Sequence, residues 1–147
     1  MLVDISYYTH GPRHIENVAL GQSNAQARAV VDSIESYIAV YEPEFLELSD
    51  LTEARVSAFP KLYQDAVKES IADYVMFFIA RDCGQHTSIT GVKVLKVADK
   101  VVSPANVQSR VWNDMVDRMR KVRMWFWGEY GIALNVHRDL RNKIFSL

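Results

Sequence analysis

The sequence is poor in the cysteines that form disulfide bonds and in the motifs that are typical of catalytic sites. One cysteine, Cys83, stands among 147 residues, so no disulfide can form within the chain and a reducing cytosol suits it. The glycine patterns of phosphate-binding loops, the GxSxG nucleophile elbow and the zinc motifs CxxC and HExxH do not occur. We therefore expect no catalytic, cofactor or metal site, and a protein that is not an enzyme.

The sequence also lacks a targeting or membrane-spanning segment. The start, Met1-Leu2-Val3-Asp4, is not a basic region followed by an apolar run, so we expect no signal peptide and no secretion. The longest nearly apolar stretch, Tyr74 to Ala80, is far shorter than the roughly 20 residues that a bilayer-spanning helix needs. We expect no association with a membrane.

What the chain does contain is enough apolar material for one folded domain. Hydrophobic residues make up 49% of it and charged residues 24%, which is the balance of a globular protein. A chain of 147 residues can bury about 70% of its unfolded surface, so it needs no disulfide or metal ion to be stable. The expected organisation is a single helical domain over residues 1–147.

Three segments carry apolar residues at steps of three and four, the spacing of amphipathic helices. They predict helices over 24–41, 61–82 and 103–127. The predicted fold class is mainly α, a bundle-like domain of three to four helices with a short β-hairpin or extended insertion. The shared core is expected to consist of Ile34, Ile38, Val67, Ile71, Tyr74, Phe78, Trp112, Met115 and Met119.

Two further segments break the helical period. Residues 1–22 show no clear repeat and predict an irregular arm. Residues 86–102 include a β-branched, roughly alternating run from Gly91 to Val97, which predicts a projecting loop or hairpin that becomes ordered on binding.

Prolines and glycines set the expected helix ends. Glu42-Pro43 should end the first helix, with a short helix restarting after it, and Glu42, Glu44 and Glu47 should form a solvated edge. Cys83-Gly84 should end the second long helix, and Gly128 the third.

The segment 103–127 carries the candidate interface. Basic residues cluster within it and are followed by Trp125-Phe126-Trp127. The candidate interface residues are Arg118, Lys121, Arg123, Trp125 and Trp127. Exposed tryptophans and arginines are typical anchors of protein–protein interfaces, whereas basic residues with aromatic platforms also suit nucleic acid. The spacing of Asp114 to Arg118 and of Asp117 to Lys121 also fits the ion pairs of an ordinary exposed face.

Charge is unevenly divided along the chain. Residues 101–147 hold eight basic and four acidic residues, a net of +4, and the remainder holds nine basic and fourteen acidic residues, a net of −5. The acidic part of one copy could meet the basic part of another, head to tail. The basic part could instead contact nucleic acid, or the division could reflect only ordinary helix surfaces.

A further alternative is a small enzyme that uses Cys83 and His86, which are three residues apart. A nucleophilic thiol needs a nearby base or cation. The apolar run before Cys83 favours a buried, inert thiol instead.

Several stretches resemble a known family. The segment Tyr37-Ile38-Ala39-Val40-Tyr41-Glu42-Pro43-Glu44-Phe45-Leu46, the helix ending Ala80-Arg81-Asp82-Cys83 and the Trp112-Asn113-Asp114-Met115-Val116 segment look similar to small proteins of Bacteroides-type phages and prophages, encoded between capsid and tail genes. The resemblance covers roughly residues 24–127 and points to α-helical head–tail connector (adaptor) proteins. It implies a structural virion protein that forms a homo-oligomeric ring, contacts the portal or other virion proteins, and resides in the virion or in the cytoplasm of the bacterial host. The alternative is a small helical nucleic-acid-binding protein that uses the basic face of helix 103–127.

Overall fold

The computed structural model describes residues 1–9, 11–15, 25–85, 87–88, 91–92, 96–97, 100–101 and 104–135. Its long helices are α1 (Ala25–Leu48), α3 (Lys61–Gln85) and α4 (Pro104–Tyr130), and the short helix α2 (Glu53–Ser57) lies between α1 and α3 in the chain. Two 3₁₀ turns, η1 (Ile5–Tyr8) and η2 (Gly11–Arg13), precede them. The protein is therefore mainly α-helical, as the sequence predicted.

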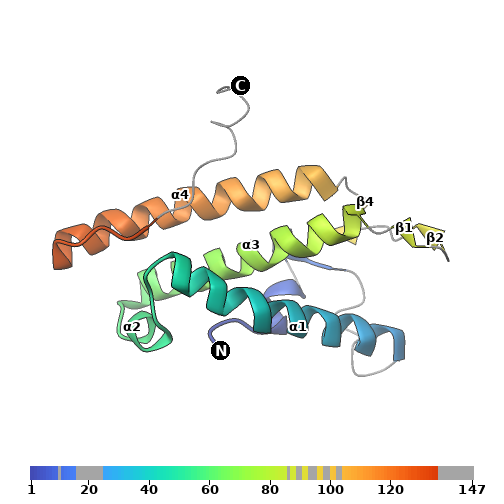
Figure 1. Ribbon diagram of the computed structural model, residues 1–147, viewed down its shortest axis with the longest axis horizontal. Coiled ribbons are helices and arrows are strands. Elements are labelled where there is room, and N and C mark those ends of the chain that lie inside the picture. Colours follow the sequence, from blue (N-terminus) through green and yellow to red (C-terminus); the bar gives the residue numbers. More distant parts are fainter. Residues whose placement is uncertain are drawn as a thin grey trace.

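Helix α3 is the central element of the fold. It lies between α4 and α1 and runs antiparallel to both (Figure 1). Its second half, Tyr74 to Ala80, is apolar nearly all round, and Val75, Met76 and Ala80 are fully buried. A helical segment that is apolar nearly all round is expected to be covered on most sides, and the burial of this one agrees.

The predicted core is largely the observed one. Seven of its nine members are at most 3% exposed, namely Ile34, Ile38, Val67, Ile71, Tyr74, Met115 and Met119. The other two, Phe78 and Trp112, are half-buried and pack against the edge of the core.

The N-terminal segment is irregular, as expected, but it is not a free arm. Val3 and Tyr8 are 1% and 0% exposed. The Tyr8 hydroxyl donates a hydrogen bond of 3.0 Å to the carbonyl of Ala72 in α3. The backbone N–H groups of Leu2 and Val3 donate to Oε1 of Glu42 at 2.7 and 2.8 Å. This segment thus covers part of α3 that α1 and α4 leave open.

Pro43 does not end α1, contrary to the prediction. The helix continues to Leu48 with Pro43 inside it. Proline removes the hydrogen bond to the carbonyl of residue 39, but both Ala39 and Pro43 are exposed, so water can solvate that carbonyl. Phe45 is 0% exposed and Leu46 9%, and their burial holds the last turn against the core.

The expected solvated edge of glutamates is also wrong for Glu42, which is 4% exposed. Its carboxylate binds the N-terminal backbone as described above. Glu44 and Glu47 are exposed, as predicted, and Glu44 also accepts a hydrogen bond of 2.5 Å from the Tyr74 hydroxyl.

The C-terminal ends of α3 and α4 lie within one turn of the predicted ones. Helix α3 passes through Cys83 and Gly84, and α4 passes through Gly128. The effective stop of α4 is Gly131, which has a φ of 66° and donates its N–H to the Trp127 carbonyl at 2.9 Å. A left-handed residue in this position is a common helix cap, and glycine adopts it without strain.

The described residues between α3 and α4 form four two-residue strands. β1 (Thr87–Ser88) pairs antiparallel with β2 (Gly91–Val92), and β3 (Lys96–Val97) pairs antiparallel with β4 (Lys100–Val101). The remaining residues of the predicted projecting segment 86–102 lie outside the described residues, so its order and role stay predictions. His86 and the side chain of Cys83 also lie outside the described residues, so the roles considered for them stay predictions.

Glu42 provides a test of the N-terminal contact. We expect Glu42→Ala to lower the free energy of unfolding by about 2–4 kcal/mol, because two backbone N–H groups would lose their acceptor in a largely buried place. Chemical denaturation measures the change, with Glu47→Ala on the exposed side of the same helix as the matched control, expected within about 0.5 kcal/mol of wild type. Equal losses in the two variants would contradict the assigned role of Glu42.

Candidate functional site

The five predicted interface residues do not share one face of α4. Arg118, Lys121 and Trp125 line a groove between α4 and α3, whereas Arg123 and Trp127 do not line it. Helical geometry gives the reason, since positions 121 and 123 point about 200° apart around the helix axis. The sequence cluster therefore divides into two surfaces.

The first surface is the α3–α4 groove, with a volume of about 540 Å³. Its lining is mostly apolar, with two cationic side chains, and consists of Leu62, Tyr63, Ala66, Arg118, Lys121, Val122, Met124 and Trp125. Leu62 and Met124 are 72% and 75% exposed. Large apolar side chains left this open beside a concave surface are typical of a place where a partner binds.

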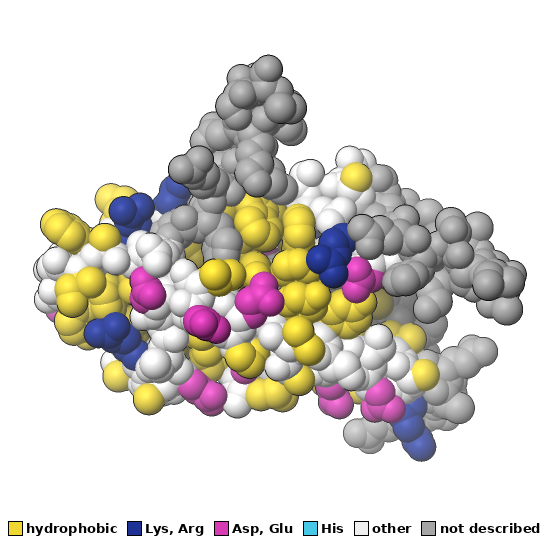
Figure 2. Space-filling model, viewed as in Figure 1, with side chains coloured by type: hydrophobic (Ala, Val, Ile, Leu, Met, Phe, Trp, Pro, Cys, Tyr) yellow, Lys and Arg dark blue, Asp and Glu magenta, His cyan; other side chains and the backbone are white. Residues whose placement is uncertain are grey.

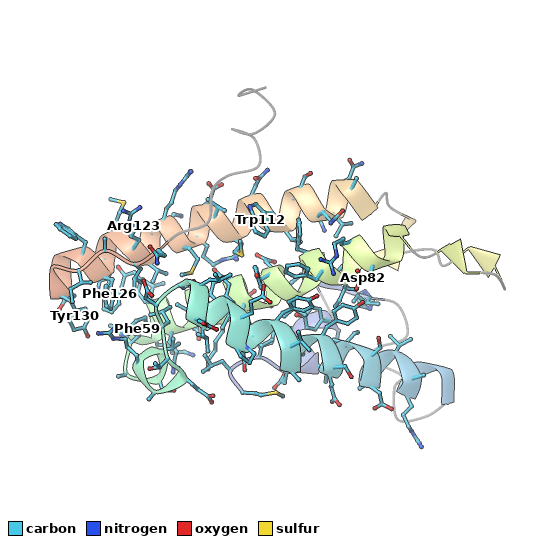
Figure 3. All side chains as sticks on the ribbon, in the orientation of Figure 1. Phe59, Asp82, Trp112, Arg123, Phe126 and Tyr130 are labelled. Carbon is cyan, nitrogen blue, oxygen red and sulfur yellow. The ribbon has the colours of Figure 1, made fainter. Side chains whose placement is uncertain are left out.

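Trp125 forms a fixed wall of the groove. Its ring stacks on Tyr63 with centroids 4.3 Å apart and planes inclined by 13°, and it meets Phe59 edge-on at 4.9 Å. Figure 3 shows Phe59 beside Phe126 and Tyr130, near the C-terminal end of α4. Trp125 is thus held by aromatic neighbours within its own chain, and it shapes the groove more than it projects from the molecule.

The second surface is the C-terminal end of α4. Trp127, Tyr130 and Ile132 are 58%, 53% and 55% exposed. Arg123 lies one helical turn before Trp127 and is exposed. Of the two candidate tryptophans, Trp127 is exposed beyond the core, whereas Trp125 packs on Tyr63 of its own chain.

Arg118 belongs to a buried ion-pair network, which the sequence did not predict. Its Nη1 is 2.6 Å from Oδ2 of Asp73 in α3, and Oδ1 of the same carboxylate is 2.8 Å from Nη1 of Arg13. Arg13 also pairs with Glu69. The Asp73 side chain is 3% exposed. This single carboxylate therefore joins α4 and the N-terminal segment to α3.

Burial raises the pKa of Asp73 above its ordinary value, and the two guanidinium groups oppose that rise. A carboxylate in this position depends on both arginines to offset the cost of its desolvation. Arg118 is therefore occupied inside the protein, and only part of its side chain, 28%, is exposed at the groove.

Lys121 and Arg123 differ from Arg118 in this respect. Both are exposed, and among the described residues neither makes an ion pair. Arg120 pairs with Asp117 at 3.5 Å.

Helix α1 is the acidic counterpart of this region, because it holds five acidic residues and one basic residue. Figure 2 shows acidic side chains over the part of the surface that α1 forms, and hydrophobic side chains between α1 and α4.

An aromatic and ionic cluster between α1 and α3 was also not predicted. Tyr41 stacks on Phe78 with centroids 4.0 Å apart, and the Arg81 guanidinium lies 4.8 Å from the Phe78 ring centroid. The Tyr37 hydroxyl donates to Asp82 at 2.5 Å, and Arg81 Nε donates to the same carboxylate at 3.0 Å. The four-residue spacing of the two tyrosines in α1 was the available signal. The side chains of this cluster stack on and hydrogen-bond to one another, so the cluster holds α1 against α3.

Within the described ranges, no group of three or more His, Cys, Asp or Glu side chains is placed to hold a metal ion. The same ranges contain no helix with the length and apolar character needed to cross a bilayer. Comparisons with protein-family models, curated proteins and solved structures gave no match to this chain.

The ion-pair network predicts a large difference between two aspartates of α3. We expect Asp73→Ala to reduce the free energy of unfolding by about 3–5 kcal/mol, because it leaves two partly buried arginines without a counter-ion. Asp65→Ala is the matched control, since Asp65 pairs with Lys61 at 3.4 Å on the exposed side and should change stability by less than about 1 kcal/mol. Thermal and urea unfolding measure both, and a small effect of Asp73→Ala would show that the network does not stabilise the fold.

Proposed function

We propose that the protein is a structural assembly subunit, a phage head–tail connector that acts by binding copies of itself and neighbouring virion proteins in a ring. The observation that carries the proposal is the pair of open surfaces on α4. The α3–α4 groove leaves Leu62 and Met124 exposed, and the end of the helix leaves Trp127 and Tyr130 exposed. A helical scaffold with exposed apolar and aromatic side chains at two sites suits a protein that is held between partners.

Charge supports the same proposal. Lys121 lines the groove, and α1 carries five acidic residues and one basic residue. Complementary charges on different surfaces of one molecule favour contacts between unlike faces, which is the contact type that closes rings. The resemblance of residues 24–127 to connector proteins gives this assembly its proposed place, between the portal and the tail.

The second candidate is nucleic-acid binding through the other flank of α4. It is favoured by Arg123 and Trp127, which are exposed and one helical turn apart. A cation and an aromatic ring in this arrangement could bind a phosphate and stack on a base.

Gene deletion tests the connector proposal. In a phage or prophage that carries the gene, we expect its loss to give DNA-filled heads without tails in electron micrographs, and wild-type protein supplied in trans should restore tailed particles. A Trp127→Ala variant should restore fewer than wild type, because it lacks an exposed aromatic anchor, whereas Arg28→Glu at an exposed position of α1 is the control. Normal tailed particles from the deletion strain would reject the proposal.

Fluorescence anisotropy with labelled single-stranded and duplex DNA tests the alternative. The connector proposal predicts no binding that depends on Arg123. Affinity that falls steeply with added salt, and that Arg123→Glu abolishes while Arg28→Glu does not, would favour the nucleic-acid function instead.

A further inference from the structure

We propose that the α3–α4 groove of one copy receives the exposed face of α1 from a second copy. This inference rests on the proposed function in requiring self-association, and it names the two surfaces that meet. The α1 face consists of Val40, Glu44, Glu47 and Leu48, which follow one another at helical spacing.

The groove requires a partner that is apolar along its middle and acidic at its side. Its floor is formed by side chains such as Ala66 and Val122, and its rims leave Leu62 and Met124 open. An amphipathic helix laid into a groove between two helices buries side chains of this kind.

The charge available at the groove is that of Lys121. Arg118 is engaged by Asp73, and the acidic residues on the neighbouring turns of α3 are engaged as well, Asp65 by Lys61 and Glu69 by Arg13. Lys121 is exposed, and within the described ranges it has no ion-pair partner. An acidic residue of the segment that occupies the groove would supply an ion-pair partner for Lys121.

Helix α1 meets both requirements. Val40 is 59% exposed and Leu48 is 49% exposed, although both are large apolar residues. Glu47 lies between them in sequence and is exposed. Glu44 accepts a hydrogen bond from Tyr74 in its own chain, so Glu47 is the carboxylate assigned to Lys121 of the next copy.

The geometry makes this contact heterologous. The groove is formed by α3 and α4, whereas the α1 face belongs to a third helix, and α3 lies between that helix and α4 (Figure 1). Each copy therefore offers one groove and one α1 face, and pairing that continues from copy to copy produces a ring or a filament.

A charge exchange tests the pairing with the full-length protein. Sedimentation over a concentration series measures self-association of wild type, Lys121→Glu, Glu47→Lys and the variant with both changes. We expect each single change to weaken association about tenfold or more, because it places like charges opposite each other, and the combined change to restore it to within about threefold of wild type. Both positions are exposed, so the variants should fold, and circular dichroism checks this.

Cross-linking identifies the contact directly. Light and ¹⁵N-labelled protein are mixed and treated with a carbodiimide, which joins a lysine amine to a carboxylate in contact. We expect Lys121–Glu47 cross-links that combine one light and one heavy peptide. Wild-type protein that stays monomeric up to about 1 mM, mixed-isotope cross-links confined to other residues, or a combined variant as weak as the single ones would overturn the proposal.

These outcomes are separable from those of the gene deletion. Tailless particles together with failed charge exchange would keep the connector function and reject this pairing. Tailed particles together with successful charge exchange would keep the pairing and reject the connector function.

Discussion

The structure depends on one constraint, which is that the second half of α3 is apolar on nearly every side. A helix with one apolar face needs one partner, but Tyr74 to Ala80 must be covered all round. Helix α4 covers one side and α1 a second, and the N-terminal segment lies against the turn just before this stretch, with Tyr8 bonded to Ala72. Two carboxylates hold these elements together. Glu42 of α1 binds the N-terminal backbone, and Asp73 of α3 binds Arg13 and Arg118 from two other elements.

The same constraint determines where open surfaces remain. α3 becomes more polar toward its start, where Lys61 and Asp65 are exposed, and there Tyr63 and Ala66 line a groove together with residues of α4. The α3–α4 groove lies at this end, with Leu62 and Met124 left uncovered. The buried middle of α3 thus holds the molecule together, and its less buried start provides the surface to which we assign a partner.

Helical periodicity was sufficient to predict the three long helices and most of the core, because burial enforces the repeat directly. It failed where long-range contacts decide the outcome. Pro43 has a local effect that favours a helix end, yet burial of Phe45 overrides it. The local sequence around Glu42 predicts a surface residue, and its burial results from contact with the N-terminal backbone, which is distant in sequence. Nothing in the spacing of Arg118 reveals Asp73, which lies on a different helix.

The candidate site was predicted in composition but not in arrangement. The basic and aromatic residues of α4 were identified together, and helical geometry separates Lys121 from Arg123 onto different flanks. Trp125 and Trp127 differ for the same reason, one packed on Tyr63 and the other exposed. The residues of α3 that complete the groove, such as Leu62, could not be found from the sequence, because their role depends on which stretch of α4 lies opposite.

The central claim is that the α3–α4 groove is an assembly surface filled by α1 of a neighbouring copy. Electron cryomicroscopy of the assembled protein tests this claim most directly. We expect an α1 helix to lie in each groove, with Val40 and Leu48 of one copy against Leu62 and Met124 of the next. Grooves that remain open to solvent in the assembly, or that hold a different segment, would contradict it.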